Sequence, residues 1–277
     1  MTIKFYKPQN PLLQKYIERY YFFENSGNLR KFSYLGFPTH NVYVTIFGNA
    51  KIKIKSSDVT IKGMEKQNIS SLLFFDTEVP GLTTYDGKTS EVTIYFKPLG
   101  LNAFLEKNLS FYKQSSISEF SPYNDYNENM LRFFKIKNPQ QKIAFLEEYL
   151  LSKLKKFHHS FLHKITHDIL KEDSSPIKTS ELAKRNNISR TTLNRQFALH
   201  LGISPNKFIK IARFRKAIDM LNEESKRGSL IDTAFLTGYF DQSHMVKDFK
   251  TLTGYSPKSF FSKVSKIHNK QLSWMFK

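Results

Sequence analysis

The chain has 277 residues, which is enough for two ordinary domains with their own hydrophobic cores. It contains no cysteine, so disulfides and thiolate chemistry are excluded. No apolar run approaches the roughly 18 to 20 residues that cross a bilayer, and the first residues lack a signal-peptide core. We therefore expect a cytoplasmic protein without a membrane partner.

The positive charge is concentrated toward the C-terminus. The chain carries 43 Lys and Arg against 24 Asp and Glu, a formal net charge of +19. Residues 176–277 hold 19 basic and 7 acidic residues (+12), and residues 1–175 hold 24 and 17 (+7). A basic domain favours a polyanion through counterion release. In the N-terminal part, the alternative is that the lysines are simply a solvated surface.

Short alternating segments predict strands in the first half of the chain. A helical turn or two at 11–20 runs into a strand through an aromatic cluster, and Pro80-Gly81 and Asp86-Gly87 mark turns. The expected strands are residues 42–46, 51–55, 71–75, 82–85 and 92–96. We expect 1–137 to be an α+β domain, a small antiparallel β sandwich or barrel with flanking helices.

A helix is predicted after Asn138-Pro139, an N-cap followed by proline at the first helical position. Its apolar face is Ile143, Leu146, Leu150 and Leu154. We expect 138–157 to be a linker helix or a dimer element. The alternative is that this face packs against its own domain.

Three histidines recur at a spacing of four residues on the next predicted helix: His159, His163 and His167, with Asp168 beside the last. This spacing can hold a metal between turns. No other ligand set accompanies them, and the same helix supplies apolar residues to a core, so we expect solvated histidines and no metal.

The segment from Leu182 to Phe260 contains the same sequence pattern twice. In each copy a short helix precedes a tight turn, at Asn187 or Gly238, where positive φ is tolerated. A second helix follows and buries two residues four positions apart. These pairs are Leu193 with Phe197, and Met245 with Phe249.

This pattern predicts an all-α domain at 158–277 with two helix-turn-helix units. The first unit is expected at about 178–200 and the second at about 229–252. A long amphipathic helix at about 204–222 connects them and would hold both second helices in phase with successive major grooves, about 34 Å apart. Of its two arginines, Arg213 and Arg215, we expect one to be structural and one to lie near phosphate.

The outward side chains of the two second helices are polar and suit base edges and phosphates. We expect DNA contacts from Arg190, Thr191, Asn194, Arg195, Gln242, Ser243, His244 and Lys247. Arg195 and Lys247 occupy equivalent positions in the two copies. Arg195 can donate two hydrogen bonds to guanine, whereas Lys247 can bind a phosphate instead. His244 could alternatively be a packing residue.

The segment from about 158 to 262 resembles the DNA-binding domain of the AraC/XylS family of transcription regulators. The motif positions in the second copy are Ala234, Gly238-Tyr239-Phe240-Asp241-Gln242-Ser243-His244, Phe249-Lys250, Gly254 and Ser256-Pro257. The first copy departs from the family at Thr179 and Asn187. Gly36-Phe37-Pro38 and the run 95–105, which we expect to open a helix, are similar to the small N-terminal β domain on one branch of the family.

The resemblance implies a sequence-specific transcription regulator, activator or repressor, that binds double-stranded DNA. An effector or partner would act on the N-terminal domain, with a homodimer and RNA polymerase as further partners. No nucleophile elbow or phosphate-binding glycine loop is present, so we expect neither an enzyme nor a cofactor. The alternatives are an adaptor whose N-terminal domain binds a protein, with DNA contact secondary, and a non-specific nucleic-acid coat.

Overall fold

The protein is described by a computed structural model that covers residues 2–25, 31–75, 80–171, 176–222, 230–263 and 274–276. The chain divides into two compact units. Unit 1 comprises residues 1–33, 41–76 and 83–158, and unit 2 comprises residues 34–40, 77–82 and 159–277. The predicted fold class, a β-rich part with flanking helices followed by an all-α part, is confirmed.

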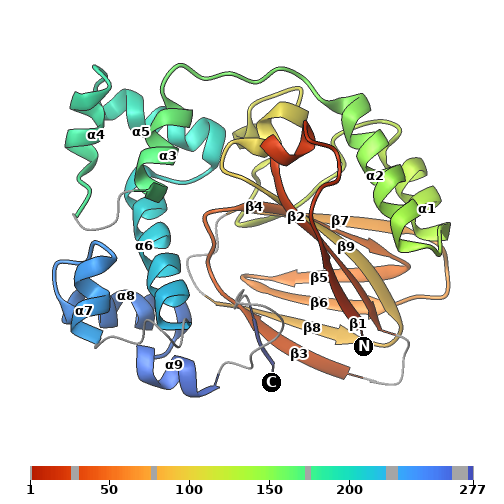
Figure 1. The fold of residues 1–277 in the computed structure, drawn as a ribbon. Helices are drawn as coiled ribbons and strands as arrows, with labels where there is room; N and C mark the ends of the chain where they lie inside the picture. Colours follow the sequence, from red (N-terminus) through yellow and green to blue (C-terminus); the bar gives the residue numbers. More distant parts are fainter. Residues whose placement is uncertain are drawn as a thin grey trace. The chain divides into compact units, whose positions relative to one another are not determined.

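Unit 1 is built on a six-stranded antiparallel sheet with the order β1-β2-β9-β4-β7-β10 (Figure 1). The central strands β4 and β9 are buried at almost every position, so both of their faces are covered. Their bounds are β1 Thr2–Tyr6, β2 Ile17–Asn25, β4 Val42–Gly48, β7 Ile69–Phe74, β9 Thr89–Phe96 and β10 Ile117–Glu119.

A second group of strands in unit 1 is ordered β5-β6-β8. The alternation of lysine and isoleucine in β5 (Ala50–Lys55) pairs it antiparallel with β6 (Asp58–Gly63). β6 pairs with β8 (Gly81–Asp86) in parallel, from Val59 opposite Thr83 to Lys62 opposite Asp86. This parallel pair departs from the antiparallel arrangement expected, because alternation along a strand carries no information on the direction of its partner.

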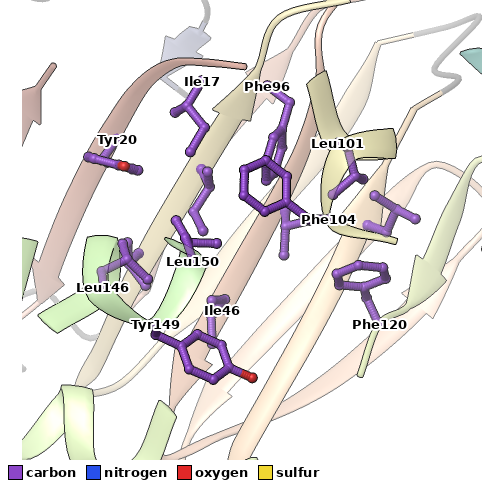
Figure 2. Packing of buried hydrophobic residues seen from close by; sticks show 14 of the residues in the cluster. Ile17, Tyr20, Ile46, Phe96, Leu101, Phe104, Phe120, Leu146, Tyr149 and Leu150 are labelled. Carbon is purple, nitrogen blue, oxygen red and sulfur yellow. The ribbon is translucent and has the colours of Figure 1, made fainter. Parts of the chain in front are cut away.

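One face of the six-stranded sheet is covered by helices α1 (Tyr126–Lys135) and α2 (Pro139–Lys153). Figure 2 shows the resulting core, in which side chains of β2, β4 and β9 meet those of α2 and of the short helix after β9. The labelled residues are Ile17, Tyr20, Ile46, Phe96, Leu101, Phe104, Phe120, Leu146, Tyr149 and Leu150. Burial of this apolar surface is the main stabilising term of unit 1.

Helix α2 begins as the sequence predicts. The Asn138 side chain accepts hydrogen bonds from the backbone N–H groups of Gln140 and Gln141. Ile143, Leu146 and Leu150 of its predicted apolar face lie in the core of unit 1. The face expected to belong to a linker or dimer helix thus packs against its own unit.

The run after β9 forms a short 3-10 helix, Gly100–Phe104, preceded by the 3-10 helix Leu13–Lys15 near the N-terminus and followed by another at Leu109–Tyr112. The longer helix expected across 95–105 is absent because Tyr95 and Phe96 complete β9. Gly100 is required where it stands, since a Cβ there would collide with the backbone carbonyl of Tyr16.

Unit 2 contains the C-terminal helices. These are α3 Leu162–Lys171, α4 Thr179–Arg185, α5 Arg190–Leu201, α6 Pro205–Asn222, α7 Leu230–Leu236, α8 Gln242–Thr253 and α9 Pro257–Lys263. The C-terminal strand β11 (Trp274–Phe276) pairs antiparallel with the end of β3 (Lys31–Gly36), from Gly36 to Tyr34. Among the described helices, none combines the length and apolar character of a membrane span.

Candidate nucleic-acid interface

The first helix-turn-helix consists of α4 and α5. Leu182 and Ala183 of α4 are buried, and Asn187 takes φ 52° in the turn. The Ile188 N–H donates to the carbonyl of Ala183 at 3.0 Å, which closes the turn. Ser189 then caps α5 by accepting a hydrogen bond from the Thr192 N–H at 3.0 Å.

The second helix-turn-helix, formed by α7 and α8, repeats this construction. Gly238 takes φ 77°, a conformation that costs glycine little. The Tyr239 N–H donates to the carbonyl of Ala234 at 3.0 Å. Asp241 caps α8 by accepting from the His244 N–H at 2.7 Å. The expected start of this unit, at residue 229, lies outside the described residues.

Both second helices are anchored in a core through fully buried residues. In α5 these are Leu193 and Phe197, and in α8 they are Met245 and Phe249. Because the side chains of a helix repeat every 3.6 residues, fixing this face inward presents the opposite face to solvent.

The candidate DNA-contacting side chains divide into three groups. Arg190, Thr191, Asn194 and Arg195 of α5, with Ser243 and Lys247 of α8, are exposed. Gln242 is half-buried at the first position of α8. His244 is also half-buried, and its ring packs edge-on against Tyr239 with centroids 5.3 Å apart.

A buried carboxylate ties the second recognition helix to α6. Asp248 of α8 lies 3.3 Å from the Lys210 ammonium, 3.6 Å from the Arg213 guanidinium and 3.9 Å from Nε2 of His244. The Arg213 guanidinium also sits over the Tyr239 ring, 5.0 Å from its centroid. Burial, with the Asp248 carboxylate nearby, raises the pKa of Tyr239 above its ordinary value. This cluster was not predicted from the sequence, although a charged residue next to Phe249 on the inward face of an amphipathic helix indicates a buried ion pair.

Helix α6 contacts both recognition helices (Figure 1). Phe208 near its start meets Phe197 of α5 at 5.9 Å between ring centroids, and Phe214 meets Phe249 of α8 at 5.0 Å. Its 18 residues span about 27 Å at 1.5 Å per residue. One continuous helix with a packed aromatic contact to each unit restricts their relative rotation.

The second arginine of α6 is engaged by a distant part of the chain. The Arg215 guanidinium donates to the carbonyl oxygens of Pro38 at 2.6 Å and Phe37 at 2.7 Å. Phe37 packs edge-on against Phe260 of α9, with centroids 5.0 Å apart. Both arginines of α6 therefore contact protein groups, and the proximity of one of them to phosphate stays a prediction.

The histidines before and along α3 do not converge. The Nε2 atom of His159 lies 3.0 Å from Oε1 of Gln196 on α5, and its ring meets that of His200 at 5.1 Å. His167 lies 3.6 Å from Asp168. Burial, and then the nearby His159, lower the pKa of His200. No group of three or more metal-ligating side chains occurs within the part of the chain that the structure describes.

The strand region of unit 1 contains a hollow of about 820 Å³ at one end of its strands. Its lining is mostly polar and charged. The lining residues are Thr2, Glu24, Asn25, Gly48, Asn49, Gly63, Met64, Glu65, Lys88, Thr89 and Ser90. Aromatic side chains of the strands stack on one another, as the half-buried Tyr43 does between Phe74 and Tyr95, with ring centroids 4.6 and 4.8 Å apart.

The Glu91 carboxyl is buried among aromatic side chains of unit 1. Glu91 of β9 accepts hydrogen bonds from the hydroxyls of Tyr21 and Tyr85, both at 2.5 Å. Burial raises the pKa of Glu91 to about 7, although the two hydroxyls act in the opposite direction.

Two helix-turn-helix units on one shared helix, each with an exposed polar recognition face, define a double helix-turn-helix domain. Residues 182–263 match a family model described as a helix-turn-helix domain. The C-terminal part of the chain therefore carries an AraC-type helix-turn-helix domain, as its motif residues predict.

The chain is also similar to individual proteins and solved structures. An uncharacterized HTH-type transcriptional regulator of Haemophilus influenzae is 29% identical over 97 residues, which cover 35% of this chain and 32% of that protein. The match thus spans about a third of the relative's length. A structure of ToxT from Vibrio cholerae has a TM-score of 0.47 at 11% identity and covers 87% of this chain and 98% of its own. The C-terminal domain of AraT from Geobacillus stearothermophilus has a TM-score of 0.36 at 23% identity, covering 41% and 94%.

Proposed function

We propose that the protein is a transcription regulator that binds duplex DNA at specific sequences through both recognition helices. The observation that carries this proposal is the pair of exposed polar faces on α5 and α8, joined by one helix that contacts both. A helix-turn-helix reads DNA by laying its second helix in the major groove. Two such helices on a common support suit two neighbouring segments of groove on one side of the duplex.

The base-reading residues would be those exposed on the two faces. Arg195 is the residue best suited to read a base, because its guanidinium can donate two hydrogen bonds to guanine O6 and N7. Lys247 stands at the equivalent position of α8 and supplies a single charge for guanine or phosphate. Thr191, Asn194 and Ser243 are smaller donors and acceptors on the same faces. His244, whose ring contacts Tyr239, would position α8 rather than read a base.

The charge of the C-terminal region supports the same proposal. The excess of twelve basic residues in 176–277 would release counterions from DNA, so that affinity falls steeply with salt. That electrostatic part is independent of sequence. Specificity must therefore come from the exposed polar side chains, and it is the property to measure.

The decisive experiment is selection of bound sites from random-sequence duplex DNA with the full chain at fixed salt. Sequence-specific binding through both recognition helices predicts recovery of one motif with two separate conserved blocks. A duplicated motif, direct or inverted, would also indicate that a homodimer binds. Equal recovery of all sequences would overturn specific regulation in favour of a non-specific coat.

Arg195→Ala tests the assignment within the interface. We expect a loss of about 1–3 kcal/mol of binding free energy and relaxed preference at one base position. A matched control is Arg185→Ala, on α4 outside the recognition helix, which should leave the base preference unchanged. Weakening that is equal on all sequences would instead make Arg195 a phosphate contact.

An effector that controls the regulator would bind unit 1. The hollow of about 820 Å³ is large enough for a small metabolite, and its lining carries Glu24, Glu65 and Lys88 with the amide of Asn49. These groups favour a polar, hydrogen-bonding effector. Thermal-shift screening of the full chain with polar metabolites should find a ligand that raises the melting temperature. Stabilisation lost in Glu65→Gln but kept in Glu119→Gln, which lies outside the hollow, would locate the site.

A protein partner of unit 1 is the competing mode of control. If no metabolite stabilises the chain and a specific protein, such as a subunit of RNA polymerase, binds it directly, the effector is excluded.

A further inference from the structure

The turns of the two helix-turn-helix units differ by one residue. Ile188 and Tyr239 are equivalent, because their N–H groups donate to Ala183 and Ala234, each five residues earlier and at 3.0 Å. In the first unit the N-cap of the recognition helix follows at once, at Ser189. In the second, the N-cap Asp241 comes two residues after Tyr239.

The extra residue is Phe240, which has no counterpart in the first unit. Its side chain is 82% exposed, although Tyr239 beside it is buried. Phe240 immediately precedes the N-cap of α8, so it borders the end of the helix that carries Gln242 and Ser243. In a helix-turn-helix, the N-terminal residues of the recognition helix approach the base edges. The insertion therefore places a large apolar group at the rim of the proposed DNA interface.

The chemistry of the groove limits what such a side chain can recognise. Base edges in the major groove present donors and acceptors, and the apolar group among them is the thymine 5-methyl, which Phe can contact. The surrounding domain is strongly basic, which suits an approach to DNA. An aromatic ring that stays in water in the free protein gains apolar burial only when such a group covers it.

We propose that Phe240 is a specificity-determining residue that packs on a thymine methyl in the half of the operator read by the second unit. This inference rests on the proposed function. It gives the two otherwise similar units different base preferences, with an apolar contact in the second and none at the matching place in the first.

Other exposed apolar side chains in the same unit offer a matched control. Phe235 of α7 is 67% exposed and lies on the first helix of the unit, before the turn that leads to the N-cap of α8. Phe235→Ala removes an exposed phenyl ring as Phe240→Ala does, although Phe235 is somewhat less exposed than Phe240. Both variants should fold, because neither side chain is part of a core, and thermal melting of each full-length variant checks this.

The test starts with selection from random-sequence duplex DNA by wild type, Phe240→Ala and Phe235→Ala. We expect Phe240→Ala to lose one thymine from the second block of the motif and to bind the wild-type site about tenfold more weakly. Phe235→Ala should keep that thymine. In the selected duplex, replacing this thymine by deoxyuridine should weaken wild type about fourfold, the contribution of one buried methyl group, and leave Phe240→Ala unchanged.

Three outcomes would overturn a proposal in distinguishable ways. An unchanged motif and affinity for Phe240→Ala would remove Phe240 from the interface. A uniform loss on all sequences, without sensitivity to deoxyuridine, would make Phe240 a backbone contact and refute the thymine assignment. If wild type itself selects no motif, the proposed function fails instead.

Discussion

Removing the Asp248 carboxylate should loosen the second recognition helix from α6 without altering the exposed face. Asp248 is buried, and its three basic neighbours, Lys210, Arg213 and His244, lie 3.3 to 3.9 Å away. Breaking a buried ion pair commonly costs about 3–5 kcal/mol because the partner charge stays buried. Here Lys210 is 30% exposed and the distances are long for hydrogen bonds, so we expect about 2 kcal/mol for Asp248→Ala.

The assay is thermal unfolding of the full chain, followed by footprinting on the selected DNA site. For a domain of this size, 2 kcal/mol corresponds to a fall of about 8 °C in the melting temperature of the C-terminal unit. Protection should fade first over the block read by the second unit. Gln196 is the matched control, because it occupies the same position on α5, where it contacts His159. Gln196→Ala should leave protection of the second block intact.

A melting temperature of Asp248→Ala within about 2 °C of wild type would refute this reasoning, since the cluster would then contribute nothing to holding α8. Equal fading of both blocks would refute it as well. In that case, the two units would respond as one body rather than through separate contacts with α6.

Three further predictions concern stability. Glu91 has a pKa raised from its ordinary 4.5 to about 7, so its folded form keeps a proton that the unfolded chain releases. Stability is then full below about pH 4.5 and falls by about 3 kcal/mol as pH rises through 7. Glu91→Gln should abolish most of that fall in urea unfolding at pH 5 and pH 8, and an unchanged pH dependence would contradict the assignment. Gly238→Ala forces alanine into φ 77° and should cost about 1–2 kcal/mol in thermal unfolding, whereas no loss would mean that the turn rearranges. Asn138→Ala removes the cap of α2 and should cost about 1 kcal/mol by the same assay, whereas Asn138→Ser should recover most of it. Equal losses for alanine and serine would show that the cap hydrogen bond is unimportant.

Local patterns made the C-terminal domain predictable. Each helix-turn-helix is specified within about 25 residues by a cap, a turn residue with positive φ and a buried pair such as Met245 and Phe249. The strands with clear alternation, such as Lys51 to Lys55, were predicted for the same reason. β1, β3 and β10 were not assigned beforehand, because they pair with strands that do not adjoin them closely in the chain. β6 was also missed, although it pairs with the neighbouring strand β5.

Long-range contacts were the features that could not be predicted. Nothing near Arg215 in the sequence indicates the carbonyl oxygens of Phe37 and Pro38, which lie more than 170 residues earlier. Similarly, the sequence around Glu91 is typical of a surface carboxylate, and only the fold brings the hydroxyls of Tyr21 and Tyr85 into hydrogen bonds with it. Phe240 belongs to a motif that the sequence shows, but its exposure depends on the folded structure. That it is an extra residue follows from the equivalent hydrogen bonds of the two turns.

Both recognition helices should read the same face of the duplex, at a fixed separation along it. The most direct measurement is the affinity of the full chain for its selected site after five base pairs, half a helical turn, are inserted between the two conserved blocks. The claim predicts a fall of about a hundredfold at constant salt, to the affinity of a single block, because the second helix would face the wrong side of the DNA. An affinity that is unchanged by the insertion would contradict it.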